Sequence, residues 1–424
     1  MVSSSASRRN PTVQSPKAAG ATPVVICGDL NLLRCFAGAG VPALVVSSDP
    51  SAVTFQSRYC SEKRVIADVK ASPVQALDDL LTLGAAIAQK PMLVYGDDAM
   101  LLLVSRNREI LSRFYRFLLP PAELIEILVD KTRFGTFAAG LSIRVPGTLT
   151  SHETKSAEDL LSRLALPMIL KPAVHVGWHE FQARSNSPRR PSKALLAETP
   201  AQLRTHYKAI RSFTDDFVVQ EYIPGGTADH YSFHAWFDET CSPLGYFVGR
   251  KIRTYPKESG HSTCLELVHE PELVQTGLEI MRMMNLQGPA KLDFKRDPRS
   301  GRYYLLEINP RYNLWHDLGA SAGVNLPYTA YRHLMGLDVA PQTQYDTRHK
   351  WLAFGDDVRA ALRYYLPDGD LSWTGWLRSY LGPAVYEVFS WKDPYPWAVQ
   401  FASALTRRST FHALRRHFRY SRQS

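Results

Sequence analysis

The stretch from Tyr303 to Asp317, YYLLEINPRYNLWHD, constrains the fold more than any other part of the chain. The apolar run before Glu307 predicts a buried strand, and alternate side chains of a strand share one face. Glu307, Asn309 and Arg311 are therefore expected to point toward one spot. Carboxylate and amide oxygens are ligands that Mg²⁺ prefers, and a guanidinium suits phosphate oxygens.

An earlier apolar run, GPAKLDF, carries a second carboxylate, Asp293. The intervening PRSG at 298–301 is typical of a turn, so the two runs are predicted to form a hairpin. Asp293 and Glu307 are then expected to bridge a metal ion across adjacent strands. This set of residues is typical of an enzyme that binds MgATP.

Three further segments carry candidate binding groups, and each has a structural alternative. Lys171 ends an apolar strand and suits a phosphate, or is a surface lysine at a strand end. The segment QEYIPGG at 220–226 offers backbone groups to a flat base, or is an ordinary strand and turn. Arg250 and Lys251 precede a small loop at 257–264 that closes over a substrate, or they line a solvated hairpin.

Length, charge and cysteines narrow the class of protein. A chain of 424 residues suggests two or three domains. Its formal net charge of +10 suits nucleic acid, an anionic membrane or anionic substrates. No zinc-finger, RNP-type or helix-turn-helix signature is present, so we predict no nucleic-acid partner. The five scattered cysteines predict reduced thiols in a cytoplasmic protein, and no apolar run reaches the length of a membrane span.

The chain is predicted to be α/β, with four parts. Residues 1–22 predict a disordered leader. Residues 23–119 alternate short strands (Val24–Cys27, Ala43–Ser48, Met92–Asp98) with helices, which predicts a parallel sheet. Residues 120–340 mix strands and helices, and residues 341–424 form a C-terminal extension rich in Trp, Tyr and Arg.

The end of the extension, residues 401–424, is a basic amphipathic pattern. It suits an anionic membrane surface, which would place the protein at the inner face of the membrane. A helix docked on the core, or a frayed tail, are the alternatives.

Two other motifs match known sites only formally. GASAG at 319–323 fits the nucleophile elbow of hydrolases, but the elbow needs a strand immediately before it. His175 with His179, and His230 with His234, have i,i+4 spacing but lack the glutamate of the HExxH motif. We assign neither a nucleophile nor zinc here.

Taken in order, DK, KP, QEYIPGG, a basic strand, KLDF and LLEINPR resemble the ATP-grasp superfamily. The segment before them looks like the pre-ATP-grasp domain of that superfamily. The whole chain most resembles carboxylate–amine ligases of the D-aspartate ligase-like group. SRYC at 57–60 and FSWKDPYPW at 389–397 add to this resemblance.

The resemblance implies a role for each matching residue. The implied nucleotide contacts are Lys131, Lys171, Gln220, Glu221, Tyr222, Ile223 and Asp229. The implied metal ligands are Asp293, Glu307 and Asn309. The implied catalytic residues are Arg311, Lys291, Arg250 and Lys251, and the implied substrate loop holds His261, Ser262 and Thr263.

One departure concerns phosphate closure. Many ATP-grasp enzymes have a glycine-rich clamp after the second lysine, but residues 175–190 here contain a single glycine. The closing loop is expected to work through Arg184, Arg189 or Arg190.

The resemblance implies that the chain joins a carboxylate to an amine with ATP, through an acyl phosphate, in two domains that clamp ATP. ATP and Mg²⁺ are the implied cofactors, with Mn²⁺ as an alternative ion. Small carboxylate and amine substrates are implied, an amino acid among them, and a homodimer is left open. A ligase at the membrane surface that modifies a cell-envelope or lipid-linked precursor is one alternative, and an ATP-binding regulator without catalysis is another.

Overall fold

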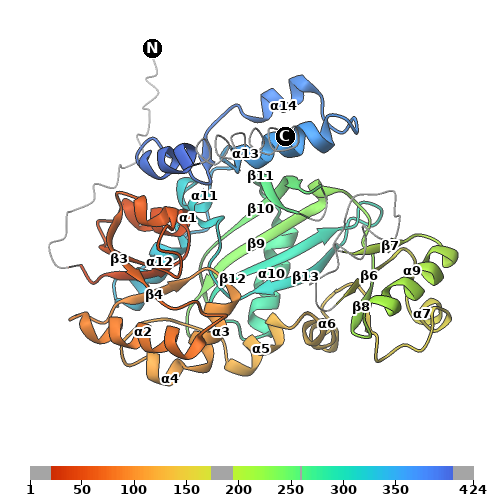
Figure 1. The fold of residues 1–424 in the computed structure, drawn as a ribbon, viewed down its shortest axis with the longest axis horizontal. Helices are drawn as coiled ribbons and strands as arrows, with labels where there is room; N and C mark the ends of the chain where they lie inside the picture. The colour runs from red at the N-terminus through yellow and green to blue at the C-terminus, as the bar shows by residue number, and fades with distance from the viewer. Residues whose placement is uncertain (1–20, 173–193, 258–259, 404–424) are drawn as a thin grey trace, which may run out of the picture.

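The computed structural model describes residues 21–172, 194–257 and 260–403. Three sheets form the molecule, with four, seven and four strands. Figure 1 shows the seven-stranded sheet in the middle, with the N-terminal sheet and the small sheet on either side of it. The expected α/β class is confirmed. Within the described residues, no helix combines the length and the apolar character that crossing a membrane requires.

The N-terminal sheet is parallel throughout, in the order β3-β2-β1-β4. Its strands are β1 (Val24–Cys27), β2 (Ala43–Ser47), β3 (Cys60–Val65) and β4 (Met92–Tyr95). Its helices are η1 (Val53–Gln56), α1 (Leu30–Ala37), α2 (Pro73–Ala86), α3 (Asp98–Arg106) and α4 (Arg108–Leu111). The predicted third strand ends earlier than expected, because the Asp97 carboxylate accepts a hydrogen bond from the Met100 amide at 2.9 Å and begins α3.

The small sheet is antiparallel, in the order β5-β8-β6-β7. Helices α7 and α9 pack on it and bury an apolar cluster of their own. The bounds are β5 (Thr148–Thr150), β6 (Met168–Pro172), β7 (Leu195–Ala197), β8 (Phe217–Glu221), α7 (Ala157–Arg163) and α9 (Pro200–Phe213). Helices α5 (Ala122–Val129) and α6 (Lys131–Gly140) connect this part to the N-terminal sheet.

The central sheet runs in the order β13-β12-β9-β10-β11-β14-β15 and is antiparallel except for its last pair. Its strands are β9 (His230–Phe237), β10 (Pro243–Tyr255), β11 (His261–Leu267), β12 (Gly288–Arg296), β13 (Tyr303–Asn309), β14 (Lys350–Leu352) and β15 (Ala384–Tyr386). One face is covered by α10 (Pro271–Met283), whose Gly277 allows close contact with Phe233. The predicted hairpin is confirmed as β12–β13.

The C-terminal extension contains helices α13 (Phe354–Ala360) and α14 (Trp373–Ser379) and the π-helical turn η3 (Ala361–Tyr365). It also supplies β14 and β15, which the sequence did not predict. Arg253 of β10 donates two hydrogen bonds of 2.8 Å to the carboxylate of Asp357 on α13, and both residues are buried. The extension is thereby fixed to the central sheet.

Three predicted segments lie outside the described residues. They are most of the leader, the expected closing loop at 175–190, and nearly all of the amphipathic tail.

Candidate active site

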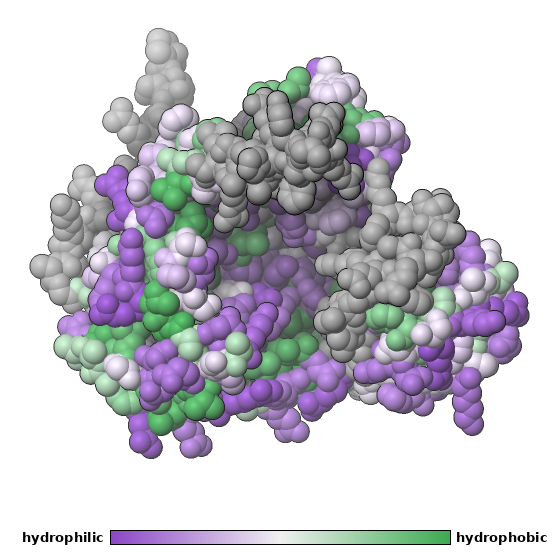
Figure 2. Space-filling view, viewed as in Figure 1, coloured by the Kyte–Doolittle hydropathy of each residue, from purple (hydrophilic) through white to green (hydrophobic). Residues whose placement is uncertain are grey.

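One face of the β12–β13 hairpin carries a row of charged side chains. Lys291, Asp293 and Lys295 alternate along β12, as the two-residue period of a strand requires. Asp293 lies directly opposite Glu307 of β13, and Lys291 lies opposite Asn309. The predicted approach of the two carboxylates is therefore confirmed. Figure 2 shows a hollow in the middle of this side of the molecule, lined mainly by hydrophilic residues.

Asp293 is buried but surrounded by positive charge. The Lys291 ammonium lies 2.8 Å from its carboxylate, and Ser232 of β9 donates a hydrogen bond to it. Burial opposes ionisation, but Lys291, Lys251 and the hydrogen bonds outweigh it and hold the pKa of Asp293 well below its usual range. Asp293 is thus an ionised carboxylate.

The donor set of this row suits a hard divalent cation. Asp293 and Glu307 supply carboxylate oxygens, and Asn309 supplies an amide oxygen, which are the ligand types of Mg²⁺. The Asn309 amide nitrogen lies 3.3 Å from a Glu307 oxygen, so the two side chains are in contact. In the described part of the chain, no three His, Cys, Asp or Glu residues gather as a metal cluster, so such a site depends on the amide of Asn309.

Arg311 lies just beyond β13 and reaches the N-terminal sheet. Its guanidinium donates to the Asp98 carboxylate at 2.5 Å and to the Gly96 carbonyl at 3.0 Å. It also donates to the Asn309 amide oxygen at 3.2 Å. Arg311 therefore connects the metal-type donors to the turn after β4, a contact that the sequence did not predict.

The predicted base-binding segment faces the same row. Tyr222 follows β8 of the small sheet, and the Lys295 ammonium lies 4.4 Å from the centre of its ring. A cation at this distance from an aromatic face is attracted to it. On the neighbouring strand, the Lys171 ammonium lies 3.1 Å from the Gln220 amide oxygen. The two sheets thus bring Lys171 and Tyr222 to the side of the hairpin that carries Asp293.

The hinge of this segment, Gln220 to Ile223, is held in place by Glu221. Its carboxylate accepts hydrogen bonds from the amides of Gly147 and Ala165, at 3.0 and 2.9 Å. The Glu221 and Tyr222 amides donate to the carbonyls of Gly147 and Pro167. Among the residues that the structure describes, the Ile223 amide has no recorded acceptor. Ile223 is therefore the hinge position whose donor suits an adenine edge.

Asp229 lies at the end of the short turn η2 (Thr227–Asp229). Its carboxylate accepts a hydrogen bond of 2.8 Å from the Gly226 amide. Gly225 has a φ of +107° and lies so close to this carboxylate that a side chain there would collide with it. Only glycine suits this turn, which fixes Asp229 beside the hinge.

Arg250 and Lys251 face opposite sides of the central sheet. Arg250 donates to Glu266 at 2.9 Å, away from Asp293. Lys251 is close enough to Asp293 to lower its pKa, and with burial as the larger cause it lowers the pKa of His230 to about 4. Of these two predicted cations, only Lys251 lies beside the carboxylate row.

The predicted substrate loop divides similarly. His261 lies 2.9 Å from the Asp356 carboxylate and is exposed, and Ser262 is half-buried. Thr263 is buried and donates to Asp357 at 2.9 Å. Thr263 therefore belongs to the contact with the C-terminal extension.

Some predictions fall where the structure gives no side chain. Lys131 is the first residue of α6, but its side chain is outside the description. The histidine pair at 175 and 179 and the arginines at 184, 189 and 190 lie outside the described residues.

Two predicted exclusions have a structural counterpart. Ser321 of GASAG ends helix α11 (His316–Ser321) and is not preceded by a strand, as the nucleophile elbow requires. His234 is buried between the rings of Phe247 and Trp315, which explains its place in the strand by packing.

Three neighbours of the row were not predicted from the sequence. Lys295 continues the alternation of Lys291 and Asp293, and this period would have identified it. Ser232 is their cross-strand neighbour on β9, which only the strand pairing reveals. The Lys291 ammonium lies 5.2 Å from the centre of the Trp315 ring, a contact without a local signal.

Comparison with known proteins agrees with this geometry. Residues 243–353 match the family described as ATP-grasp in the biosynthetic pathway with Ter operon. D-aspartate ligase of Enterococcus faecium is 25% identical over 233 residues, which are 53% of this chain and 54% of that protein. The chain thus spans about half the length of this relative, and the predicted resemblance to it is confirmed.

Two solved structures share the fold. N5-carboxyaminoimidazole synthetase of Staphylococcus aureus, complexed with ADP, has a TM-score of 0.55 at 14% identity, covering 76% of this chain and 79% of its own. L-amino acid ligase of Bacillus licheniformis has a TM-score of 0.51 at 14% identity, covering 74% of each chain. With its ordered motifs, three sheets and paired carboxylates, the chain is similar to ATP-grasp proteins.

Proposed function

We propose that this chain is an ATP-dependent ligase that joins a carboxylate to an amine through an acyl phosphate. The observation that carries the proposal is the ionised Asp293 opposite Glu307, beside Asn309 and close to Lys251 and Lys291. Carboxylates and cationic side chains this close together suit the binding of a metal ion and the phosphate groups it contacts. The names of the similar proteins, D-aspartate ligase and L-amino acid ligase, support the same class.

The proposed reaction has two steps. A substrate carboxylate oxygen attacks the γ-phosphorus of ATP, and the bond from that phosphorus to the bridging oxygen breaks, which releases ADP. The amine nitrogen then attacks the acyl carbon, the bond to the phosphate oxygen breaks, and a proton leaves the nitrogen. Activation is needed because a free carboxylate would have to expel oxide, whereas the acyl phosphate expels phosphate.

The residues have distinct proposed roles in this chemistry. Lys131 and Lys171 bind nucleotide phosphates, and the hinge from Gln220 to Ile223 receives adenine, with Asp229 at the ribose. Asp293, Glu307 and Asn309 would hold Mg²⁺, or Mn²⁺ in its place, which neutralises phosphate charge when bound.

Lys251, Lys291 and Arg311 are proposed to hold the anionic carboxylate and the tetrahedral intermediate that follows it. In the structure, Lys291 is paired with Asp293 and Arg311 is paired with Asp98. A bound metal ion would take the place of Lys291 at Asp293, and a bound substrate would take the place of Asp98 at Arg311. No role at the reacting atoms is proposed for Arg250, because its guanidinium faces Glu266.

We also propose that residues 23–119, 120–340 and 341–424 act as three parts of one enzyme. In support, the small and central sheets are both built mainly from the middle part. Strands β14 and β15 join the third part to the central sheet.

The test measures release of ADP and phosphate from MgATP with mixed carboxylates and amines. Glu307→Gln is expected to lower turnover by at least 100-fold, because it removes one of two carboxylates in the donor set. Glu279→Gln, on the exposed side of α10, is the matched control and is expected to stay within twofold of the unmodified protein. Unchanged turnover in Glu307→Gln would refute the metal assignment. ATP binding by the unmodified protein without any turnover would favour the alternative of an ATP-binding regulator without catalysis.

A further inference from the structure

A cavity of about 880 Å³ lies apart from the carboxylate row. It is lined by helix α1, the helices α11 and α12 (Leu326–Leu334), and the C-terminal segment after β14. No residue with a role in the proposed ATP site lines it. Its size is that of a small-molecule pocket.

The C-terminal wall of the cavity is fixed to the N-terminal part of the chain by contacts of Asp393. Asp393 is fully buried and accepts hydrogen bonds from the Ser57 hydroxyl at 2.7 Å and the Arg58 amide at 3.0 Å. Arg34 of α1 lies 3.7 Å from the same carboxylate and donates to the Val388 carbonyl at 2.5 Å. The cavity is therefore a defined space between two parts of the chain that lie far apart in sequence.

Asp317 of α11 lines this cavity without a partner for its charge. Within the described residues, its carboxylate makes no recorded hydrogen bond or ion pair. Burial raises the pKa of Asp317 to about 7, with Arg34 lowering it and Asp29 raising it. The Arg34 guanidinium cannot compensate fully, because it is committed to Asp393 and to backbone carbonyls. A partly buried carboxylate without a partner is costly, and a cationic ligand would offset that cost.

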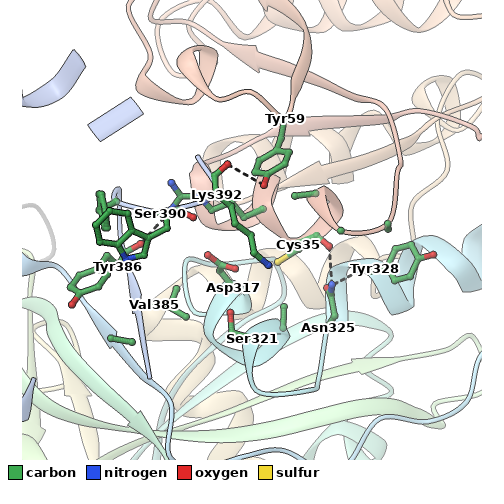
Figure 3. A pocket seen from close by; sticks show the side chains of 18 of the residues that line it. Cys35, Tyr59, Asp317, Ser321, Asn325, Tyr328, Val385, Tyr386, Ser390 and Lys392 are labelled. Carbon is green, nitrogen blue, oxygen red and sulfur yellow. Dashed lines mark hydrogen bonds between the residues drawn. The ribbon is translucent and has the colours of Figure 1, made fainter. Parts of the chain in front are cut away.

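A positive charge enters the same space from the opposite wall. Figure 3 shows the side chains of Asp317 and Lys392 extending into the cavity, from α11 and from the C-terminal segment. In the described part of the chain, the Lys392 ammonium has no recorded acceptor, whereas its carbonyl is held by Tyr59. Aromatic rings complete the wall, with Phe389 and Trp391 packed edge to face at 4.8 Å. The lining thus pairs one acid and one base across an aromatic pocket.

We propose that this cavity binds the amine substrate as a zwitterion, either a free amino acid or a short peptide, before its amine reaches the acyl phosphate. Its ammonium group binds Asp317 and its carboxylate binds Lys392, while Phe389 and Trp391 contact its side chain. This inference rests on the proposed ligase function, because it supplies the second substrate of that reaction.

The position of the cavity agrees with such a role. Asp29 of the turn after β1 is close enough to raise the pKa of Asp317. Gly28 of the same turn approaches Gly96, whose carbonyl accepts from Arg311. Through these contacts, the two turns at the carboxyl end of the parallel N-terminal sheet link the cavity to Arg311. Open parallel sheets bind ligands at this end, where the strand order reverses.

The test is calorimetric titration of the full chain, without ATP, against free amino acids and dipeptides and their N-acetylated and C-amidated forms. At least one free form is expected to bind, and its N-acetylated form is expected to bind at least tenfold more weakly. Asp317→Asn is expected to abolish this preference. Lys392→Met is expected to lose discrimination between the carboxylate and the amide. Asp78→Asn, on the exposed side of α2, is the control and should change neither.

The outcomes separate this inference from the proposed function. If the protein turns over substrates but its amine binding does not depend on Asp317, the cavity assignment is overturned and the proposed ligase function stands. Amine binding that depends on Asp317 without ADP release would support the cavity and overturn the ligase.

Discussion

Asp317→Asn is expected to stabilise the fold, and the gain is expected to grow with pH. The ordinary pKa of this carboxyl is 3.8, and burial raises it to about 7 in the folded chain. The folded state therefore holds its proton after the unfolded state has lost it. Stability falls as the pH rises from about 4 to about 7 and then stays level. Asparagine does not ionise, so the stability of the Asp317→Asn variant does not fall over this pH range for this reason.

The magnitude follows from the two pKa values. A tenfold change in proton affinity is worth about 1.4 kcal/mol, so the full difference corresponds to about 4 kcal/mol above pH 7. Asp317 is only half-buried and faces an open cavity, so water screens part of this cost. Asp29 and Arg34 also face the group and partly oppose each other. We expect a measured gain of about 2 kcal/mol at pH 8 and almost none at pH 4.

The assay is differential scanning calorimetry of both proteins from pH 4 to pH 8. The difference in Tm between Asp317→Asn and the unmodified chain is expected to be small at pH 4 and to rise until about pH 7. Asp78→Asn, which removes an exposed carboxylate of the same N-terminal part, should show no such trend. A difference in Tm that does not depend on pH would refute the reasoning, because the loss of ionisation is its only source.

Two further predictions concern packing around the central sheet. Arg253→Met is expected to cost about 3–5 kcal/mol in urea unfolding, because it leaves a fully buried carboxylate without its cation. Arg359→Met breaks an exposed pair and should cost less than about 1 kcal/mol; equal losses would contradict the argument. Gly249→Ala places a methyl group 2.5 Å from the ring of Trp315 and is expected to cost about 1–3 kcal/mol and to change near-UV circular dichroism. Gly355→Ala, where a methyl group meets no atom within 4 Å, should leave the spectrum unchanged.

The sequence predicted well what depends on local pattern. The strand Val24–Cys27 has the predicted bounds, because a short apolar run after a polar leader has one natural interpretation. The hairpin and the approach of Asp293 to Glu307 followed from two apolar runs joined by a turn. Both rest on the two-residue period of a strand, which is visible in a single sequence.

The sequence could not predict contacts between distant segments. Ser57 and Asp393 are 336 residues apart, and no periodicity reports their hydrogen bond. The same limit applies to Arg311, whose ion pair with Asp98 spans 213 residues. Which face of β10 carries the site was also open, because alternation separates Arg250 from Lys251 without saying which one lies beside the carboxylates.

The ion pair with Asp98 ties Arg311, the arginine proposed to hold the substrate, to the start of α3. An anionic substrate that takes this guanidinium must compete with a carboxylate already bound at 2.5 Å. When the substrate binds Arg311, Asp98 in the first turn of α3 loses its ion pair with the end of β13. Substrate binding would then be detected in the N-terminal part of the chain, as faster amide hydrogen exchange at the start of α3. The chain would report its own occupancy through a contact that has no part in the chemistry.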